Sequence, residues 1–338
     1  MPSLKANINL QPFNTFNIKA KAANYLAFSS VESLNDYFQA YAELPFLVLG
    51  GGSNLLFKKD FPGTVLHNQI LGIKTQDLAG DFVLVEAGAG ENWHDFVQWC
   101  INQGFGGLEN LSLIPGKVGA APIQNIGAYG VELKDVFHSL TAYDIQNRKL
   151  IELDSKACDF GYRYSRFKGD WKGRFIITNV TFKLSTANHQ LNTSYGAITK
   201  ALAPKQTITI RSIADAVIQI RQSKLPDPIE LGNAGSFFKN PIISQEEFDR
   251  IQAKYPSIPN YTAGGKYVKV PAGWLIDQCG WKGKRFGSTG CYEKQALVIV
   301  NYGAATGQEI WAFAQQLIAS VEEKFGITLE PEVNVIGD

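Results

Sequence analysis

The feature that most constrains this 338-residue chain is a run of small residues, IPGKVGAAPIQNIGAYG, at residues 114–130. It contains Gly116, Gly119, Gly127 and Gly130 and almost no charge. Glycine costs about 1 kcal/mol per position in a helix relative to alanine, so the run favours loops over a packed helix. Such loops can bring backbone N–H groups against an anionic ligand such as a pyrophosphate.

Two further glycine-rich segments resemble this run. GGGSNLL at residues 50–56 follows the strand-like stretch 46–49, and GNAGSFFKNP at residues 232–241 places Ser236 between glycine and phenylalanines. Two glycine loops about 60 residues apart predict a large phosphate-bearing cofactor held from two sides. A nicotinamide-type Rossmann fingerprint fails because Leu55 stands where its last glycine is needed, and no P-loop motif occurs.

Composition excludes several classes of protein. The net charge of +1 gives no electrostatic case for nucleic acid or an anionic membrane. No stretch approaches the ~20 apolar residues of a membrane span, and the N-terminal residues lack the apolar segment of a signal peptide. The four cysteines form no C-x-x-C pair and predict free thiols in a reducing cytoplasm. The four histidines are scattered, so no metal site is expected.

Periodicity and capping signals predict an α+β chain. Strands are expected at 23–28, 46–49 and 82–86, β-rich sequence at 139–153 and 175–184, and a strand-like tail at 329–337. Capping boxes at Ser29, Ser212, Ser244 and Thr306 are expected to open helices, the last reaching Phe325. A further helix is expected over residues 92–103, and residues 186–208 are expected to be a loop. The prolines of LPDP, at residues 225–228, indicate a domain boundary.

Three side chains have both a structural and a functional interpretation. Ser236 with Lys239 matches S-x-x-K, but Ser165 with Lys168 matches it too, so the pattern is weak evidence for acyl transfer. Ser236 is instead a candidate proton donor, oriented by Lys239 and Asn240, or an ordinary loop serine. Arg163, among aromatic residues, either meets an anion or forms a surface cation–π contact. Glu332, in an apolar tail, is either exposed or functional.

The whole chain, in order, resembles the UDP-N-acetylenolpyruvoylglucosamine reductase family, in the variety with a tyrosine-bearing substrate loop. The matching segments are NTF, LGGGSNLLF, GLENLSLIPGKVGAAPIQNIGAYGVEL, FGYRYSRFK, NTSYG, SKLPDP, GNAGSFFKNP, PAGWLIDQCG and LEPEV. The resemblance implies a two-part FAD-binding region of the vanillyl-alcohol-oxidase (PCMH) type, at residues 1–72 and 73–224. It also implies a smaller α+β substrate domain at 225–328 and a strand, 329–338, that returns to the active site.

The resemblance implies NADPH-dependent, FAD-mediated reduction of UDP-N-acetylglucosamine enolpyruvate to UDP-N-acetylmuramate, a peptidoglycan precursor. Hydride would add to C3 of the enolpyruvyl group, and negative charge would develop on its carboxylate. Arg163 matches the carboxylate-stabilising arginine, Glu332 the catalytic glutamate and Ser236 the serine that protonates C2. FAD would be non-covalent, since the first glycine loop holds no histidine or cysteine to link it. The enzyme is expected to be a cytoplasmic monomer.

Other roles carry over from the family at matching positions. The cofactor-binding residues would be Gly50, Gly51, Gly52, Ser53, Asn54, Pro115, Gly116, Gly119, Ala120, Ala121, Gln124, Asn125, Gly127, Ala128 and Tyr129. The substrate-binding residues would be Tyr195, Lys224, Asn240, Gln295 and Tyr162. The chain departs from the family where Ala120 and Ala121 replace frequent serines, so backbone N–H groups would contact the flavin phosphates there. Asn334 also stands where an arginine is common.

Two rival functions remain open at the level of sequence. A carbohydrate oxidase of the same fold would pass electrons to oxygen and would need no Ser236. A non-catalytic module that binds FAD or a sugar nucleotide would give Ser236, Arg163 and Glu332 no shared role. Turnover with the enolpyruvyl substrate separates both from the reductase.

Overall fold

The computed structural model describes residues 2–202 and 207–337, and these form two compact units. The first unit contains residues 1–8, 22–51 and 62–223, and the second contains residues 9–21, 52–61 and 224–338. Each unit is thus assembled from three separate stretches of chain. The expected functional ranges, with boundaries at residues 72, 224 and 328, remain a prediction about which parts bind which ligand.

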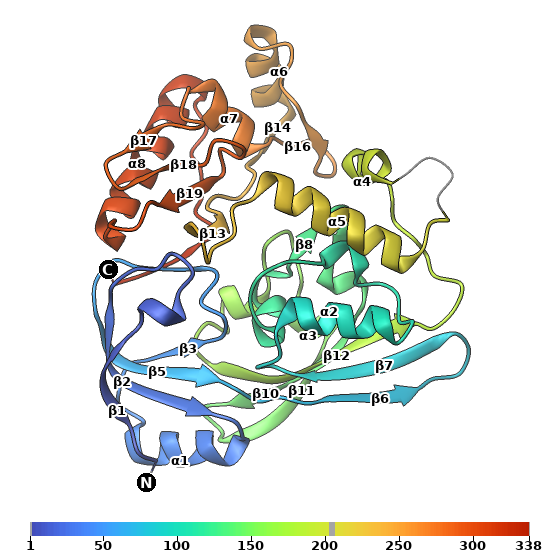
Figure 1. Ribbon diagram of the computed structural model, residues 1–338, viewed down its shortest axis with the longest axis vertical. Coiled ribbons are helices and arrows are strands. Elements are labelled where there is room, and N and C mark those ends of the chain that lie inside the picture. Colours follow the sequence, from blue (N-terminus) through green and yellow to red (C-terminus); the bar gives the residue numbers. More distant parts are fainter. Residues whose placement is uncertain (1, 203–206, 338) are drawn as a thin grey trace. The chain divides into compact units, whose positions relative to one another are not determined.

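Two sheets form the framework of the first unit (Figure 1). The four-stranded sheet has the order β1 (Lys5–Asn9), β2 (Lys21–Phe28), β5 (Phe61–Asn68), β3 (Phe46–Leu49). The five-stranded sheet has the order β11 (Lys149–Asp154), β10 (Phe137–Asp144), β12 (Phe175–Ser185), β7 (Phe82–Gly88), β6 (Ile73–Asp77). Its strands pair antiparallel throughout, whereas β3 and β5 run parallel.

Helices cover these sheets through apolar faces. Trp93 and Phe96 of α2 (Trp93–Asn102) pack on Phe182 of β12, with ring centroids 6.0 and 5.1 Å from that of Phe182. Residues of α1 (Val31–Tyr41) share a second core with both sheets. The remaining helices of this unit are α3 (Ser155–Cys158), α4 (Gly196–Ala201) and α5 (Ile210–Lys224), with 3-10 turns η2 (Glu109–Leu111), η3 (Val118–Gln124), η4 (Leu133–Asp135) and η5 (Arg166–Lys168) and the short pair β8 (Gly127–Ala128) and β9 (Val131–Glu132).

The second unit is built around the long helix α8 (Gly307–Phe325). Its buried Ile310, Phe313, Leu317 and Val321 repeat every three to four residues, which gives the helix one apolar face. That helix contacts the sheet β13 (Gly232–Ser236), β19 (Val298–Asn301), β18 (Thr289–Cys291), β17 (Arg285–Phe286). The other elements are β14 (Ile242–Ser244), β16 (Tyr267–Lys269), β15 (Tyr261–Thr262), the parallel pair β4 (Leu55–Phe57) and β20 (Asn334–Ile336), α6 (Gln245–Lys254), α7 (Ala272–Gln278) and η1 (Gln11–Phe13).

The α+β prediction is confirmed, as are the capping boxes that open α6 and α8. Two expected helix starts are wrong. Ser30, not Ser29, caps α1, because Ser30 is extended and its side chain accepts the N–H of Ser33. Helix α5 begins at Ile210, because Thr209 and Ser212 exchange hydrogen bonds between their side chains and backbone N–H groups.

One other expectation needs correction. Helix α4 lies within residues 186–208, which were expected to be a loop; residues 203–206 of that range lie outside the described residues. Among the described residues, no helix is both long and apolar enough to cross a membrane.

Candidate active site

The predicted site residues fall in both units. Those in the first unit are Gly50, Gly51, Pro115, Gly116, Gly119, Ala120, Ala121, Gln124, Asn125, Gly127, Ala128, Tyr129, Tyr162, Arg163 and Tyr195. Those in the second unit are Gly52, Ser53, Asn54, Lys224, Ser236, Asn240, Gln295 and Glu332. The first glycine loop therefore passes from one unit into the other.

In the first unit the two glycine loops lie against each other. A Cβ atom added at Gly51 would stand 2.8 Å from Cα of Gly116, closer than packed atoms approach, so only glycine fits there. One added at Gly50 would stand 3.4 Å from Cβ of Lys117. Gly116 itself has a φ of 119°, which other residues rarely adopt. Two backbones without side chains thus meet at one place, as a shared ligand would require.

Two N–H groups of the 3-10 turn η3 already donate to carbonyl groups of neighbouring segments. The N–H of Gly119 donates to the carbonyl of Ala89 at 2.9 Å, and the N–H of Ala120 donates to Lys117 at 3.1 Å. The side chain of Ala121 is buried in the core, whereas Ala120 is exposed. A phosphate contact at Ala120 would therefore share a donor that is already bonded.

Asn125, at the end of η3, holds the shape of the loop. Its φ is 44°, and its side chain is fully buried. The amide nitrogen donates to Oε2 of Glu132 and to the carbonyl of Gly161, both at 3.0 Å, while the amide oxygen accepts the N–H of Lys134. These bonds satisfy the side chain, so a contact with a cofactor would come from the backbone of Asn125.

Arg163 lies beside the second glycine loop. Nη2 of Arg163 donates to the carbonyl of Gly127 at 2.8 Å, and the guanidinium lies 5.5 Å from the ring centroid of Tyr162. The residue itself has a φ of 53°, an uncommon conformation for arginine. Strained residues of this kind cluster at functional sites. The contact with Gly127 fixes the guanidinium next to the predicted cofactor residues.

Two predicted tyrosines meet in the same unit. The rings of Tyr129 and Tyr195 are edge to face, with centroids 5.2 Å apart. Nδ2 of Asn110 donates both to the carbonyl of Tyr129 and to that of Asn192, three residues before Tyr195. The predicted substrate loop is therefore anchored to the predicted cofactor loop.

In the second unit, the rest of the first glycine loop lies over the N-terminal segment. Gly52 has a φ of 62°, and a Cβ atom there would stand 1.9 Å from the carbonyl oxygen of Phe13. The N–H of Thr15 donates to the carbonyl of Gly52 at 3.1 Å. Nδ2 of Asn54 donates to the carbonyl of Glu332 at 3.3 Å. The end of the loop is thus bonded to the LEPEV tail.

Ser236 ends β13 between Gly235, with a φ of 67°, and the buried ring of Phe237. The orienting role expected of Lys239 and Asn240 stays a prediction. Nζ of Lys239 pairs with Glu330 at 3.0 Å, and Oδ1 of Asn240 accepts an N–H from α7.

Glu332 approaches Ser236 through backbone pairing. The N–H of Glu332 donates to the carbonyl of Phe237 at 2.8 Å, and Pro331 forms an isolated bridge with Phe238. Two residues later the tail becomes β20 and pairs with β4. The predicted glutamate and the residue after the predicted serine are therefore neighbours in one compact unit.

Asn240 and Gln295 flank the first turn of α7. Oδ1 of Asn240 accepts the N–H of Ala272 at 3.0 Å, which satisfies a donor that the helix start leaves open. A Cβ atom added at Gly273 would stand 2.9 Å from Oε1 of Gln295. The structure thus brings together two of the predicted substrate-binding residues. Lys224 is the last residue of α5.

Comparisons with known proteins decide the family. A family model described as "UDP-N-acetylenolpyruvoylglucosamine reductase, C-terminal domain" matches residues 227–336, and one described as "FAD binding domain" matches residues 23–154. Curated UDP-N-acetylenolpyruvoylglucosamine reductases are similar over nearly the whole chain. The protein of Flavobacterium johnsoniae is 50% identical, covering 98% of this chain and 99% of its own, and that of Pseudomonas putida is 47% identical, covering 97% of each. This chain belongs to the UDP-N-acetylenolpyruvoylglucosamine reductase family.

A solved structure agrees in fold with this family assignment. The crystal structure of the reductase from Thermus caldophilus superposes with a TM-score of 0.67 at 24% identity and covers 98% of both chains. The predicted fold is confirmed, and the chain is an FAD-containing oxidoreductase of this family.

The glycine loops at residues 50–56 and 114–130 fit the FAD that a reductase of this family uses. Gly51 and Gly116 are both partly exposed, and no side chain intervenes where their loops meet, which suits a pyrophosphate. Close to this loop, the buried Oδ1 of Asn110 and the buried Oγ of Ser112 have no protein partner among the described residues. Unsatisfied buried acceptors and donors of this kind call for a bound water or ligand group.

Sequence reasoning missed three residues that hold the cofactor side of the site. Nε of Arg221 donates to the carbonyl of Leu113 at 3.1 Å, and its charge acts on the Tyr129 hydroxyl. Nδ1 of His94 accepts the N–H of Leu113 at 3.0 Å. Leu113 has a φ of 59°, so both of its backbone groups are clamped in a strained conformation. Asn110 is the third missed residue.

Burial sets the ionisation in this cluster. It raises the pKa of the Tyr129 hydroxyl, with the charge of Arg221 opposing the shift, and it lowers the pKa of His94. His94 therefore stays neutral at pH 7, as an acceptor of the Leu113 N–H requires. No sequence motif marks Arg221, which occupies an ordinary polar position on a helix.

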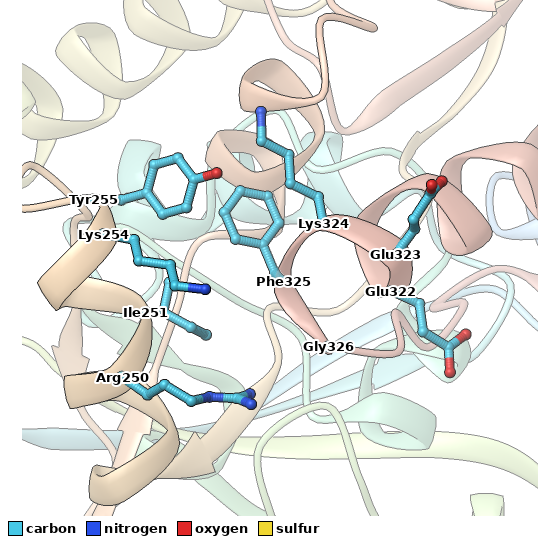
Figure 2. Close-up of a pocket in the computed structure, with 9 residues that line it drawn as sticks. All are labelled: Arg250, Ile251, Lys254, Tyr255, Glu322, Glu323, Lys324, Phe325 and Gly326. Carbon is cyan, nitrogen blue, oxygen red and sulfur yellow. The ribbon is translucent and has the colours of Figure 1, made fainter.

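The second unit contains a separate hollow of its own (Figure 2). It lies between α6 and the end of α8 and is lined by Arg250, Ile251, Lys254, Tyr255, Glu322, Glu323, Lys324, Phe325 and Gly326. No predicted site residue is among its lining residues. In the part of the chain that the structure describes, no three His, Cys, Asp or Glu side chains are placed to hold a metal.

Proposed function

We propose that this chain reduces UDP-N-acetylglucosamine enolpyruvate to UDP-N-acetylmuramate, with NADPH as the electron source. The name shared by relatives that match over nearly their whole length supports this activity. One observation carries the assignment of residues: the 2.8 Å bond from the Glu332 N–H to Phe237, which places the tail beside Ser236. Bound FAD supplies the hydride that adds to C3 of the enolpyruvyl group.

Arg163 and Glu332 would stabilise the substrate carboxylate as negative charge develops on it. Preorganised donors aimed at developing charge make a large contribution to catalysis. The bond to Gly127 holds the guanidinium of Arg163 before substrate arrives, and the bond to Phe237 holds the backbone of Glu332. The role assigned to Glu332 requires its carboxyl group to donate a hydrogen bond to the substrate carboxylate, which only a protonated carboxyl group can do.

Ser236 completes the reaction by giving its hydroxyl proton to C2. Hydride at C3 and a proton at C2 together saturate the double bond and leave the sugar nucleotide intact. The sugar nucleotide would be held by Tyr195, Lys224, Asn240 and Gln295, with Tyr162 beside the flavin. The pairing of Asn240 and Gln295 around α7 supports a common role for those two residues.

The decisive experiment follows the two half-reactions of Ser236→Ala under anaerobic conditions. NADPH should bleach the flavin at the wild-type rate, whereas recovery of colour with the enolpyruvyl nucleotide should slow about a hundredfold or more, the usual contribution of a positioned proton donor. Ser236→Thr, which keeps a hydroxyl, is the matched control and should retain more activity. Recovery within about threefold of wild type in Ser236→Ala would show that the proton comes from elsewhere.

We further propose that the enzyme works in the cytoplasm and as a monomer. All four cysteines are free thiols, as expected of a protein in the reducing cytoplasm. We expect a monomer without nucleic-acid or membrane partners, and light scattering of the FAD-loaded protein would test the oligomeric state.

A further inference from the structure

The C-terminal tail changes its pairing partner at Glu332. Before this point it pairs with the segment after Ser236: the N–H of Lys239 donates to the carbonyl of Glu330 at 3.0 Å, and the N–H of Glu332 donates to Phe237. After it, residues 334–336 pair in parallel with residues 55–57. Val333, between the two pairings, is buried. Glu332 therefore stands where the serine segment and the first glycine loop are joined.

Two asparagines make this junction. The carbonyl of Asn54 accepts both the N–H of Asn334, at 3.0 Å, and its side-chain Nδ2, at 3.1 Å. In return, Nδ2 of Asn54 donates to the carbonyl of Glu332 at 3.3 Å. The three bonds close a ring that includes the last residue of the glycine loop, the predicted acid and Asn334.

We propose that Asn334 is a positioning residue, which fixes the backbone of Glu332 by clamping the carbonyl of Asn54. The inference deepens the proposed function and rests on it, since it concerns the acid of the same reaction. In this chain the clamp uses the side-chain amide donor of asparagine. An aspartate would place lone pairs against the carbonyl oxygen of Asn54, and alanine would leave only the backbone bond. A longer amide would overreach a carbonyl that the residue's own N–H already contacts.

This role predicts an effect confined to one half-reaction. Glu332 is assigned to the step in which the sugar nucleotide takes hydride, and it has no part in the oxidation of NADPH. The side chain of Asn334 is exposed, so its hydrogen bond contributes little to global stability and the variants should fold. A misplaced Glu332 should therefore slow reduction of the sugar nucleotide but leave reduction of the flavin unchanged.

The test compares Asn334→Ala, Asn334→Gln and Asn334→Asp with the wild-type holoenzyme by anaerobic stopped flow. The matched control is Gln245→Ala, which removes an exposed amide hydrogen bond at the start of α6 in the same unit. NADPH should bleach the flavin in every variant within about twofold of wild type. Recovery with UDP-N-acetylglucosamine enolpyruvate should slow about tenfold or more in the Ala and Gln variants and further in the Asp variant, as expected when a preorganised group is displaced.

Three outcomes would overturn the proposal: recovery within about twofold in Asn334→Ala, equal slowing of both half-reactions, or a Gln245→Ala variant that slows as much. Failure of the proposed function is a separate result. In that case the wild-type flavin itself would not recover its colour with the sugar nucleotide, whatever residue stands at position 334.

Discussion

Arg163 and Arg221 both direct a guanidinium N–H at a backbone carbonyl, the first at Gly127 and the second at Leu113. A carbonyl oxygen accepts the hydrogen bond and orients the side chain without cancelling its charge. Burial opposes the charge of Arg221 and lowers its pKa, although an arginine remains protonated at any pH the enzyme meets. The region of the first unit that we assign to the cofactor thus holds two oriented positive charges.

Arg163→Lys tests whether the planar guanidinium is needed. A lysine ammonium is a point charge and cannot bond the Gly127 carbonyl and a substrate carboxylate in one plane. We expect FAD content near wild type and a drop of about a hundredfold in the rate at which the sugar nucleotide reoxidises the flavin. Stopped-flow absorbance measures both steps, and a rate within threefold of wild type would show that charge alone is sufficient.

Individual residues differ in how visible they are in the sequence. Ser236 and Gly51 were proposed as site residues because glycine-rich segments interrupt the periodicity of helices and strands. Arg163 was found because it stands between aromatic residues. Arg221 and His94 were missed because each occupies a polar position on an amphipathic helix, where most side chains only meet water. Both residues bond the backbone of Leu113, and no sequence pattern predicts the positive φ of that leucine.

At the scale of elements, the capping boxes show how local sequence sets helix boundaries. In α8, Oγ1 of Thr306 accepts the N–H of Glu309 at 3.2 Å, and Oε2 of Glu309 accepts the N–H of Thr306 at 2.7 Å. In α6, Ser244 and Glu247 make the same exchange. Both helices were predicted because all of this information lies within four residues.

Thr306→Ala should destabilise the protein through the start of α8. Loss of a threonine N-cap typically costs about 1 kcal/mol of the free energy of unfolding. The hydrogen bonds from Thr306 hold the pKa of Glu309 below its ordinary value of 4.5. A lowered pKa stabilises the fold above the unfolded value, so this contribution is complete above about pH 4.5 and is lost as the pH falls below it. Urea denaturation of wild type and variant at pH 7 and pH 4 measures the difference, which should shrink at the lower pH.

A substitution in helix α7, Gly273→Ala, tests substrate binding without destabilising the fold. The Cβ atom of Gly273→Ala would stand 2.9 Å from Oε1 of Gln295, the end of a flexible side chain that can move away. We therefore expect the melting temperature and FAD content to stay near wild type, while KM for the sugar nucleotide rises about tenfold, as for the loss of one neutral hydrogen bond. An unchanged KM would remove Gln295 from the substrate site.

Elements without local signals were predicted less well. Helix α4 is only six residues long and begins at Gly196, the last residue of the polar NTSYG segment; it has neither a capping box nor a repeated apolar face. Strand β20 was expected from its apolar residues, but its parallel partner β4 is far away in sequence. Pairing across such distances depends on the assembled core, which a local pattern does not encode.

At the scale of the whole molecule, each compact unit contains two of the four cysteines: Cys100 and Cys158 lie in the first unit, and Cys279 and Cys291 lie in the second. Cys100, Cys158 and Cys291 are buried, and Cys279 is partly exposed. Burial raises the pKa of Cys158 and of Cys291 to about 12, and it raises the pKa of Cys100 as well.

Alkylation should therefore select a single thiol in the native protein. The thiolate is the reactive form, and at pH 8 a thiol with a pKa of about 12 is almost entirely protonated. We expect iodoacetamide to modify Cys279 first, giving one adduct by intact mass spectrometry, and to modify all four cysteines after denaturation in urea. Early modification of Cys291 would show that the second unit opens readily.

Because the second unit is assembled from three stretches of chain, it can complete its fold only late in synthesis. Nδ2 of Asn301 donates to the carbonyl of Phe16 at 2.8 Å across 285 positions of sequence, and a Cβ atom at Gly307 would stand 1.7 Å from the carbonyl oxygen of Phe57. Contacts of such long range slow folding. On the ribosome, residues 9–21 and 52–61 emerge early, yet the surface that buries them is translated last. The nascent chain must therefore keep these segments out of other associations until synthesis is complete.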